Sequence, residues 1–175
     1  MLTVDRLIND VLQKEGDYVN HKSDRGGPTK YGITQDTLES WRGIPVSPFD
    51  VQNLSKDEAR DIYERNYYRG PRIDELPELL QPVTFDMAVN HGPRKSVKIV
   101  QTVAGKMSGK RLVLDGVIGP ATVVACNIAV NVYGHEVVKR ICQARAQYYR
   151  DIVANDPSQA VFLKGWVARN ETFMV

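Results

Sequence analysis

Apolar residues recur at helical spacing along most of the chain, and the first such stripe runs directly into an acid. Its members stand at i, i+3, i+4, i+7 and i+8, and they are Val4, Leu7, Ile8, Val11 and Leu12. This spacing predicts the buried face of an amphipathic helix. Glu15 comes four residues after Val11 and so falls on the same face. Gly16 follows it, as is typical just past a helix end.

The position of Glu15 predicts a carboxyl group that resists ionisation. Burial disfavours its charged form, and so does the negative end of a helix dipole. The pKa of Glu15 is therefore expected to be raised, as a general acid working near neutral pH requires. The simpler alternative is a side chain that turns to solvent, as most glutamates do.

The segment after this helix holds two further groups suited to glycoside hydrolysis. Asp24 supplies a second carboxyl group, and Thr29 supplies a hydroxyl. Between them, Gly26-Gly27-Pro28 indicates a tight turn that lets the backbone approach a ligand. Short β-like runs at 18–19 and 31–33 predict a small ribbon around this turn. Glycoside hydrolysis uses a carboxyl group with a raised pKa, an ionised carboxylate and a hydroxyl, and one ribbon would bring these groups together.

The same stretch resembles the N-terminal signature of a known family, glycoside hydrolase family 108. The resemblance is carried by Glu15-Gly16, Asp24, Gly26-Gly27, Thr29 and Tyr31-Gly32-Ile33-Thr34. Family members are phage endolysins and bacterial relatives that act as N-acetylmuramidases on peptidoglycan. This chain has Asp17 where the family usually has a second glycine, so Asp17 competes with Asp24 as second carboxylate. Other phage muramidases, to which the segment is also similar, typically place one more residue between the aspartate and the threonine.

The resemblance implies hydrolysis of the β-1,4 bond between N-acetylmuramic acid and N-acetylglucosamine. Glu15 would protonate the leaving oxygen. Asp24 would stabilise the transition state or help to place a water held by Thr29, and Tyr31 would offer an aromatic surface to the sugar. No cofactor or metal is implied, and retention or inversion stays open. The alternatives are a lytic transglycosylase, a chitinase-like enzyme and a non-catalytic wall-binding module.

A second resemblance, to a peptidoglycan-binding segment, lies in the middle of the chain. It is carried by the runs 86–92 (DMAVNHG), 100–101 (VQ) and 114–122 (LDGVIGPAT). Asp86 and Asn90 stand at i and i+4 on one predicted helix, so they are candidate substrate-binding residues. An acid early in a helix also has a structural explanation, because it complements the helix dipole. Asp115-Gly116 and Gly119-Pro120 likewise read as a turn and a helix start.

The predicted fold is α+β but mainly α, lysozyme-like, with about seven helices and one small ribbon carrying part of the active site. A chain of 175 residues fits one compact globule. We expect a catalytic lobe at 1–92 and a helical lobe with the peptidoglycan-binding segment at 93–175. Since the predicted helices leave no apolar stripe unpaired, a monomer is expected.

Charge and composition limit the partners. A net charge of +2 with interrupted basic clusters argues against a nucleic-acid-binding surface. Cys126 and Cys142 fall in helical patterns and are expected to be buried thiols rather than a disulfide. We find no signal peptide or membrane span, so the expected location is the host bacterial cytoplasm. The resemblance implies that a phage holin lets the enzyme reach the periplasm at lysis.

Overall fold

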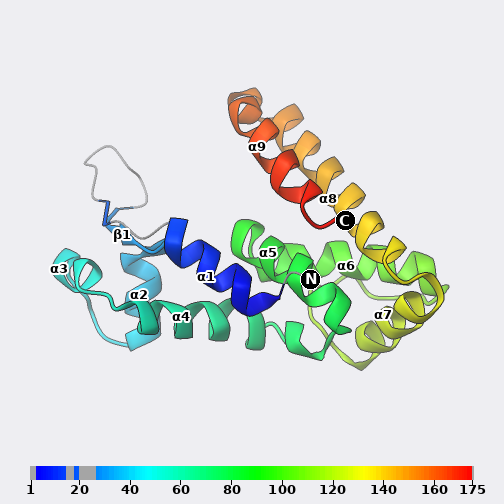
Figure 1. Cartoon of the computed structure of the whole chain (residues 1–175), viewed down its shortest axis with the longest axis horizontal. Coiled ribbons are helices and arrows are strands. Elements are labelled where there is room, and N and C mark those ends of the chain that lie inside the picture. Colours follow the sequence, from blue (N-terminus) through cyan, green and yellow to red (C-terminus); the bar gives the residue numbers. More distant parts are fainter. Residues whose placement is uncertain (1–2, 15–17, 20–26, 175) are drawn as a thin grey trace. The chain divides into compact units, whose positions relative to one another are not determined.

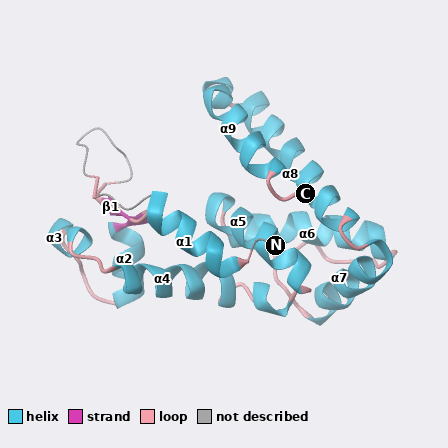
Figure 2. Cartoon of the chain, viewed as in Figure 1, coloured by secondary structure: helices cyan, strands magenta, loops and turns pink. Residues whose placement is uncertain are grey.

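The structure is a computed structural model that describes residues 3–14, 18–19 and 27–174. Within these residues it contains nine α-helices and one two-stranded antiparallel ribbon (Figures 1 and 2). The predicted class, mainly helical with one small ribbon, is confirmed. The chain forms two compact units, Thr3–Asn66 and Tyr67–Val175, called here the ribbon unit and the helical unit. The lobes predicted at 1–92 and 93–175 stay a prediction.

The ribbon unit is built around its first helix. Its elements are α1 (Val4–Lys14), β1 (Thr29–Lys30), β2 (Ile33–Thr34), α2 (Gln35–Arg42), α3 (Pro48–Gln52) and α4 (Lys56–Glu64). The apolar face of α1 packs against α4, and the last four of its five members, Leu7, Ile8, Val11 and Leu12, are buried as the spacing predicts. Arg60 on α4 donates a hydrogen bond to Asn9 on α1 and so fixes the pairing of these helices.

Local capping signals set the helix starts in this unit. The Thr34 side chain accepts a hydrogen bond from the backbone N–H of Thr37 and begins α2, and Ser55 caps α4 in the same way. The short α3 has no counterpart among the predicted helices. Its signal is the capping box of Ser47 and Asp50, with Pro48 at the first helical position.

The helical unit contains five α-helices, joined by short connections except for an irregular segment at residues 109–119. They are α5 (Gln81–His91), α6 (Pro93–Ser108), α7 (Pro120–Tyr133), α8 (Glu136–Asn155) and α9 (Ala160–Glu171). Shorter elements are the π-helix η1 (Arg65–Arg69) at the junction of the units and the 3₁₀ turns η2 (Ile73–Glu75), η3 (Glu78–Leu80) and η4 (Pro157–Gln159). Helix α6 contacts α5, α7 and α8, so it forms the centre of the unit. Among the described helices, none combines the length and apolarity that a membrane span needs.

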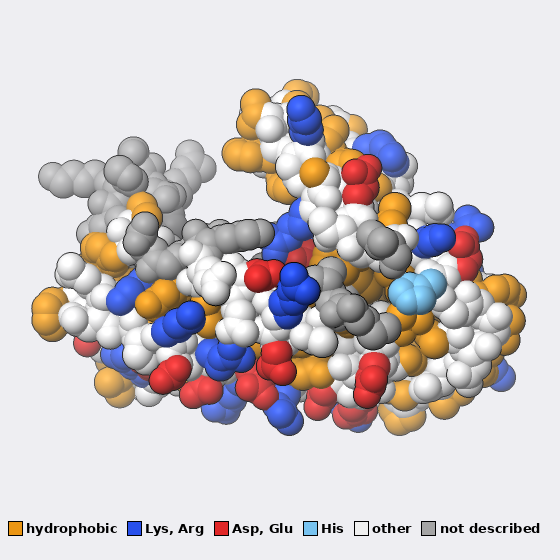
Figure 3. Space-filling view, in the orientation of Figure 1, with side chains coloured by type: hydrophobic (Ala, Val, Ile, Leu, Met, Phe, Trp, Pro, Cys, Tyr) orange, Lys and Arg blue, Asp and Glu red, His pale blue; other side chains and the backbone are white. Residues whose placement is uncertain are grey.

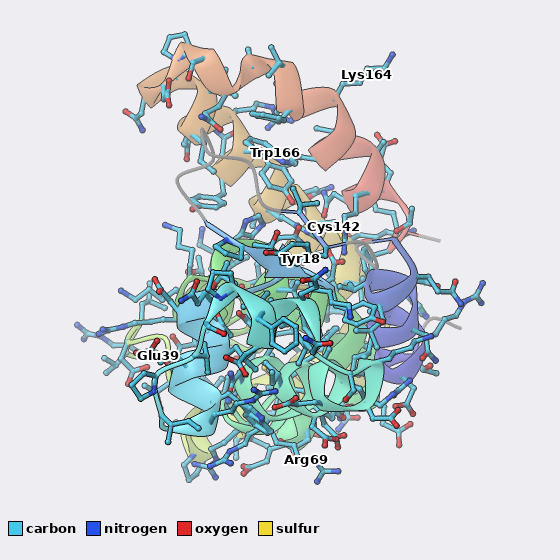
Figure 4. The ribbon with its side chains drawn as sticks, turned by 90° about the vertical axis from the view of Figure 1, so that its left-hand side faces the viewer. Tyr18, Glu39, Arg69, Cys142, Lys164 and Trp166 are labelled. Carbon is cyan, nitrogen blue, oxygen red and sulfur yellow. The ribbon has the colours of Figure 1, made fainter. Side chains whose placement is uncertain are left out.

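Helix α9 folds back on α8 through an aromatic stack. Trp166 turns toward α8, whereas Lys164 turns away from it (Figure 4). The Trp166 ring stacks on Tyr149 of α8 at 5.2 Å and on Phe162 at 5.9 Å between centroids. Val161 and Phe162, at the start of α9, are exposed. Figure 3 shows hydrophobic side chains on the surface of this helix pair.

Cys126 and Cys142 are free and buried, as predicted. Burial raises the pKa of the Cys126 thiol to about 12 and that of Cys142 to about 11. Both thiols are therefore protonated at neutral pH and serve as small core side chains.

Candidate functional site

The ribbon of the ribbon unit is a hairpin whose two-residue turn is Tyr31-Gly32. Both residues have positive φ, 53° for Tyr31 and 73° for Gly32, as a type I′ turn requires. This conformation costs a non-glycine residue about 1–3 kcal/mol. Tyr63 of α4 offsets part of this cost, because its hydroxyl donates a 2.9 Å hydrogen bond to the Tyr31 carbonyl.

The pairing of the ribbon differs in detail from the prediction. Val19 and Thr29 exchange two backbone hydrogen bonds of 2.9 Å, so the run at 18–19 does join the ribbon. The run at 31–33 does not form a strand along its length, because Tyr31-Gly32 make the turn. The second strand is Ile33–Thr34, in which Thr34 faces Thr29 and Ile33 faces Lys30.

This register determines where Thr29 points. Side chains alternate between the two faces of a strand. Ile33 is buried in the core at 1% exposure, so Thr29, which pairs with Thr34, belongs to the opposite face. Thr29 is half-buried, so its hydroxyl is partly accessible to solvent. A hydroxyl in this position is available to hold a water or a substrate oxygen.

The Tyr31 ring lies at the same turn and is half-exposed. The Lys30 amine stands 5.3 Å from the ring centroid and donates a 2.8 Å hydrogen bond to the Gln52 carbonyl of α3. These contacts hold the base of the turn against α3, so the aromatic ring is carried by a fixed piece of backbone.

The carboxylates predicted for this site, Glu15, Asp17 and Asp24, lie outside the described residues. Glu15 follows the last residue of α1 directly in the sequence. Their assignment to catalysis stays a prediction.

The two substrate-binding candidates of the helical unit have different surroundings. Asp86 on α5 is 1% exposed, and both its carboxylate oxygens are bound. Arg145 of α8 donates to Oδ2 at 2.6 Å, and Arg169 of α9 donates to Oδ1 at 2.7 Å. Asn90 is exposed at the end of the same helix and donates a 2.6 Å hydrogen bond to the Asp86 carbonyl. This geometry favours a structural role for Asp86 and leaves Asn90 accessible.

Sequence reasoning missed the arginine partners of Asp86, although a signal for one was present. Arg145 sits within the apolar stripe of α8, between Cys142 and Tyr149, and a buried arginine requires a carboxylate nearby. Arg145 is fully buried, and its Nε also donates a 2.6 Å hydrogen bond to the Tyr149 hydroxyl.

His91 lies against this cluster, with its ring 5.3 Å from Tyr148 and 5.2 Å from Tyr149. Burial, together with the nearby positive charge of Arg145, lowers the pKa of His91 to about 4. The imidazole is therefore neutral at pH 7. Its Nε2 is buried without a hydrogen-bond partner in the described part of the chain.

The 114–122 run that resembles a wall-binding segment is held together by Gln101 of α6. The Gln101 side chain donates to Asp115, Val117 and Thr122, and it accepts from the Gly116 N–H at 3.0 Å. A Cβ at Gly116 would stand 2.5 Å from Arg94, so only glycine fits there. These contacts favour the structural explanation for Asp115-Gly116.

The comparisons with known proteins identify the class of this chain. Residues 8–92 match the Glycosyl hydrolase 108 family, and residues 95–171 match a family described as a predicted peptidoglycan domain. The chain is therefore a glycoside hydrolase that carries a peptidoglycan-binding domain. No curated protein matches it.

The solved structure of Brucella abortus SagA is similar along nearly the whole chain. The two share 33% sequence identity with a TM-score of 0.78, and the similarity covers 97% of this chain and 90% of the SagA chain. The chain belongs to glycoside hydrolase family 108. The family membership expected from the N-terminal residues is confirmed, and the phage origin stays a prediction.

Proposed function

We propose that the protein is an endo-acting N-acetylmuramidase that hydrolyses the β-1,4 bond between N-acetylmuramic acid and N-acetylglucosamine in peptidoglycan. The observation that carries this proposal is the coincidence of a glycoside hydrolase domain with a peptidoglycan domain in one chain. An enzyme with both parts cuts the polymer that it holds. A role as phage endolysin, reaching the wall through a holin, would follow from the sequence resemblance alone.

Glu15 is the proposed general acid. It follows α1, whose buried face has the spacing that leads to position 15, and it lies within the residues that match the hydrolase family. A carboxyl group near the C-terminal end of a helix and close to a core keeps its proton to higher pH. Glu15 would pass this proton to the leaving glycosidic oxygen.

Asp24 and Thr29 are proposed to complete the reaction. Asp24 would remain ionised and stabilise positive charge on the sugar ring, or orient the attacking water. The Thr29 hydroxyl, which lies on the ribbon face opposite the buried Ile33, would hold that water. Tyr31, fixed at the adjoining turn, would stack on a sugar ring, and Asn90 would bind a second part of the polymer.

The direct test measures release of soluble fragments from purified peptidoglycan by wild type and by Glu15→Gln. We expect the variant to be slower by about 10²- to 10⁴-fold, the usual contribution of a general acid. It should still sediment with the polymer and unfold at the same denaturant concentration as wild type. Full activity in Glu15→Gln would refute the assignment.

Parallel variants separate the two candidate second carboxylates. Asp24→Asn should reduce the rate strongly and Asp17→Asn little. The reverse order would transfer the role to Asp17. If wild type releases no fragments but still binds the polymer, the chain is a wall-binding module and not an enzyme. If all three variants cleave as fast as wild type, none of these carboxylates is catalytic.

A further inference from the structure

A pocket of about 390 Å³ opens at the start of α6 in the helical unit. Its lining is formed by six consecutive or nearly consecutive residues: His91, Gly92, Pro93, Arg94, Lys95 and Lys98. The lining includes three cationic side chains and no acid. The sequence pattern alone indicated an ordinary solvated surface here, because it did not place these cations around a hollow.

The cations of this pocket are unfavourable for the helix that carries them. The start of α6 is the positive end of its dipole, where acids stabilise and cations destabilise a helix. The first turn of α6 nevertheless contains no acid. Helix stability therefore does not explain Arg94 and Lys95 in this first turn, and Lys98 adds a third positive charge one turn further along. Attraction of an anionic ligand does explain the cluster.

Two of the three cations are held in place. The Arg94 Nε donates a 3.1 Å hydrogen bond to the Asp115 carbonyl, and the Lys95 amine lies 4.5 Å above the centre of the Tyr148 ring. Tyr148 is in turn packed edge-on against His91. Side chains fixed in this way lose little conformational freedom when a ligand binds.

We propose that this pocket binds a carboxylate of a peptidoglycan stem peptide, with Lys95 and Lys98 as its anchoring groups. This inference rests on the proposed function. Lys95 and Lys98 lie within the residues that match the peptidoglycan domain. The acetylated sugars of peptidoglycan carry no free charge once the lactyl group is joined to the peptide, whereas the stem peptide carries carboxylates. A cationic pocket in this domain therefore recognises the peptide and not the glycan.

The test measures binding of a soluble disaccharide-peptide fragment to the full-length protein by calorimetry. The pocket variant is the double substitution Lys95→Gln and Lys98→Gln. The matched control is Lys139→Gln and Lys164→Gln, which removes the same charge from exposed positions on α8 and α9. Arg94 is left in place because it also contacts the 114–122 run. Each protein is also titrated with the fragment after amidation of its carboxylates and with inorganic phosphate.

We expect the pocket variant to bind the fragment at least about tenfold more weakly, since charge-assisted hydrogen bonds are lost. The control should stay within about twofold of wild type. Amidation of the fragment should weaken binding to wild type and make it insensitive to the pocket substitutions. Equal affinities of pocket variant and control, or undiminished binding of the amidated fragment, would overturn the proposal. If inorganic phosphate binds with the same affinity as the fragment, the proposal is also overturned, because the pocket would then be a general anion site.

The proposed function is tested separately by digestion of intact peptidoglycan with the same proteins. Digestion without charge-dependent binding would refute only the proposal that the pocket binds the stem peptide. Charge-dependent binding without digestion would refute the hydrolase mechanism alone.

Discussion

At the scale of single residues, the buried carboxylate of Asp86 pairs with Arg145 and Arg169 in the helical unit. Its partner Arg145 is fully buried, and the Nη1 of this arginine has no hydrogen-bond partner among the residues that the structure describes. Breaking a buried pair leaves one charge without compensation in a medium of low polarity. Asp86 is thus tied to folding more directly than to ligand binding.

We therefore expect Asp86→Asn to reduce the free energy of unfolding of the helical unit by about 3–5 kcal/mol. The matched control is Glu75→Gln, since Glu75 forms an exposed ion pair with Arg72 in the same unit. That control should cost less than about 1 kcal/mol. Urea titration followed by the fluorescence of Trp166, in a Trp41→Phe background, measures both. A loss no larger than that of the control would show that the buried charge does not support the fold.

His91 gives the helical unit a dependence on pH. The pKa of His91 is lowered from 6.5 to about 4 in the folded protein, so between these values the unfolded chain binds more protons. Stability should consequently fall as the pH is lowered from about 6.5 to 4, and change little above that range. His91→Phe should flatten this part of the profile, whereas His135→Phe, at an exposed position, should not. Unfolding at a series of pH values measures the slope, and an unchanged slope in His91→Phe would contradict the account.

At the scale of elements, variants of the Tyr31-Gly32 hairpin can separate two contributions to substrate binding: the conformation of the turn and the contact made by the Tyr31 ring. Asparagine tolerates the left-handed conformation of position 31. Tyr31→Asn should therefore keep the turn and remove only the ring, which raises KM for peptidoglycan fragments by about three- to tenfold with kcat nearly unchanged. Tyr63→Phe removes the hydrogen bond to the turn and leaves the ring. If both variants change KM equally, the shape of the turn and not the Tyr31 ring determines binding.

Local sequence signals were enough to predict most helices. Features that depend on contacts between distant residues could not be predicted from the sequence. The buried face of α1 and the caps at Thr34 and Ser55 follow from residues within one or two turns of each other. The register of the ribbon could not be predicted in this way, because Tyr31-Gly32 lacks the Asn-Gly pattern typical of such turns. The position of Arg145 in the apolar stripe of α8 indicates that it needs a carboxylate, but the sequence does not say that this carboxylate is Asp86, 59 residues away. The proposed catalytic carboxylates rest on sequence spacing and family likeness.

At the scale of the whole molecule, the chain joins a hydrolase domain to a peptidoglycan domain. The ribbon unit carries Thr29 and Tyr31, and the helical unit carries the cationic pocket at the start of α6. Removing the charge of the pocket should therefore weaken capture of the polymer without changing the chemistry of cleavage. The account predicts one class of product, whatever the affinity for the wall.

The mass of that product tests the central claim most directly. Purified peptidoglycan is digested with wild type, and the soluble fragments are reduced and weighed by mass spectrometry. The account predicts fragments that end in reduced N-acetylmuramic acid, because water has added to the cleaved bond. Fragments that end in 1,6-anhydro-muramic acid would contradict hydrolysis and identify a lytic transglycosylase, and ends in reduced N-acetylglucosamine would contradict the assigned bond.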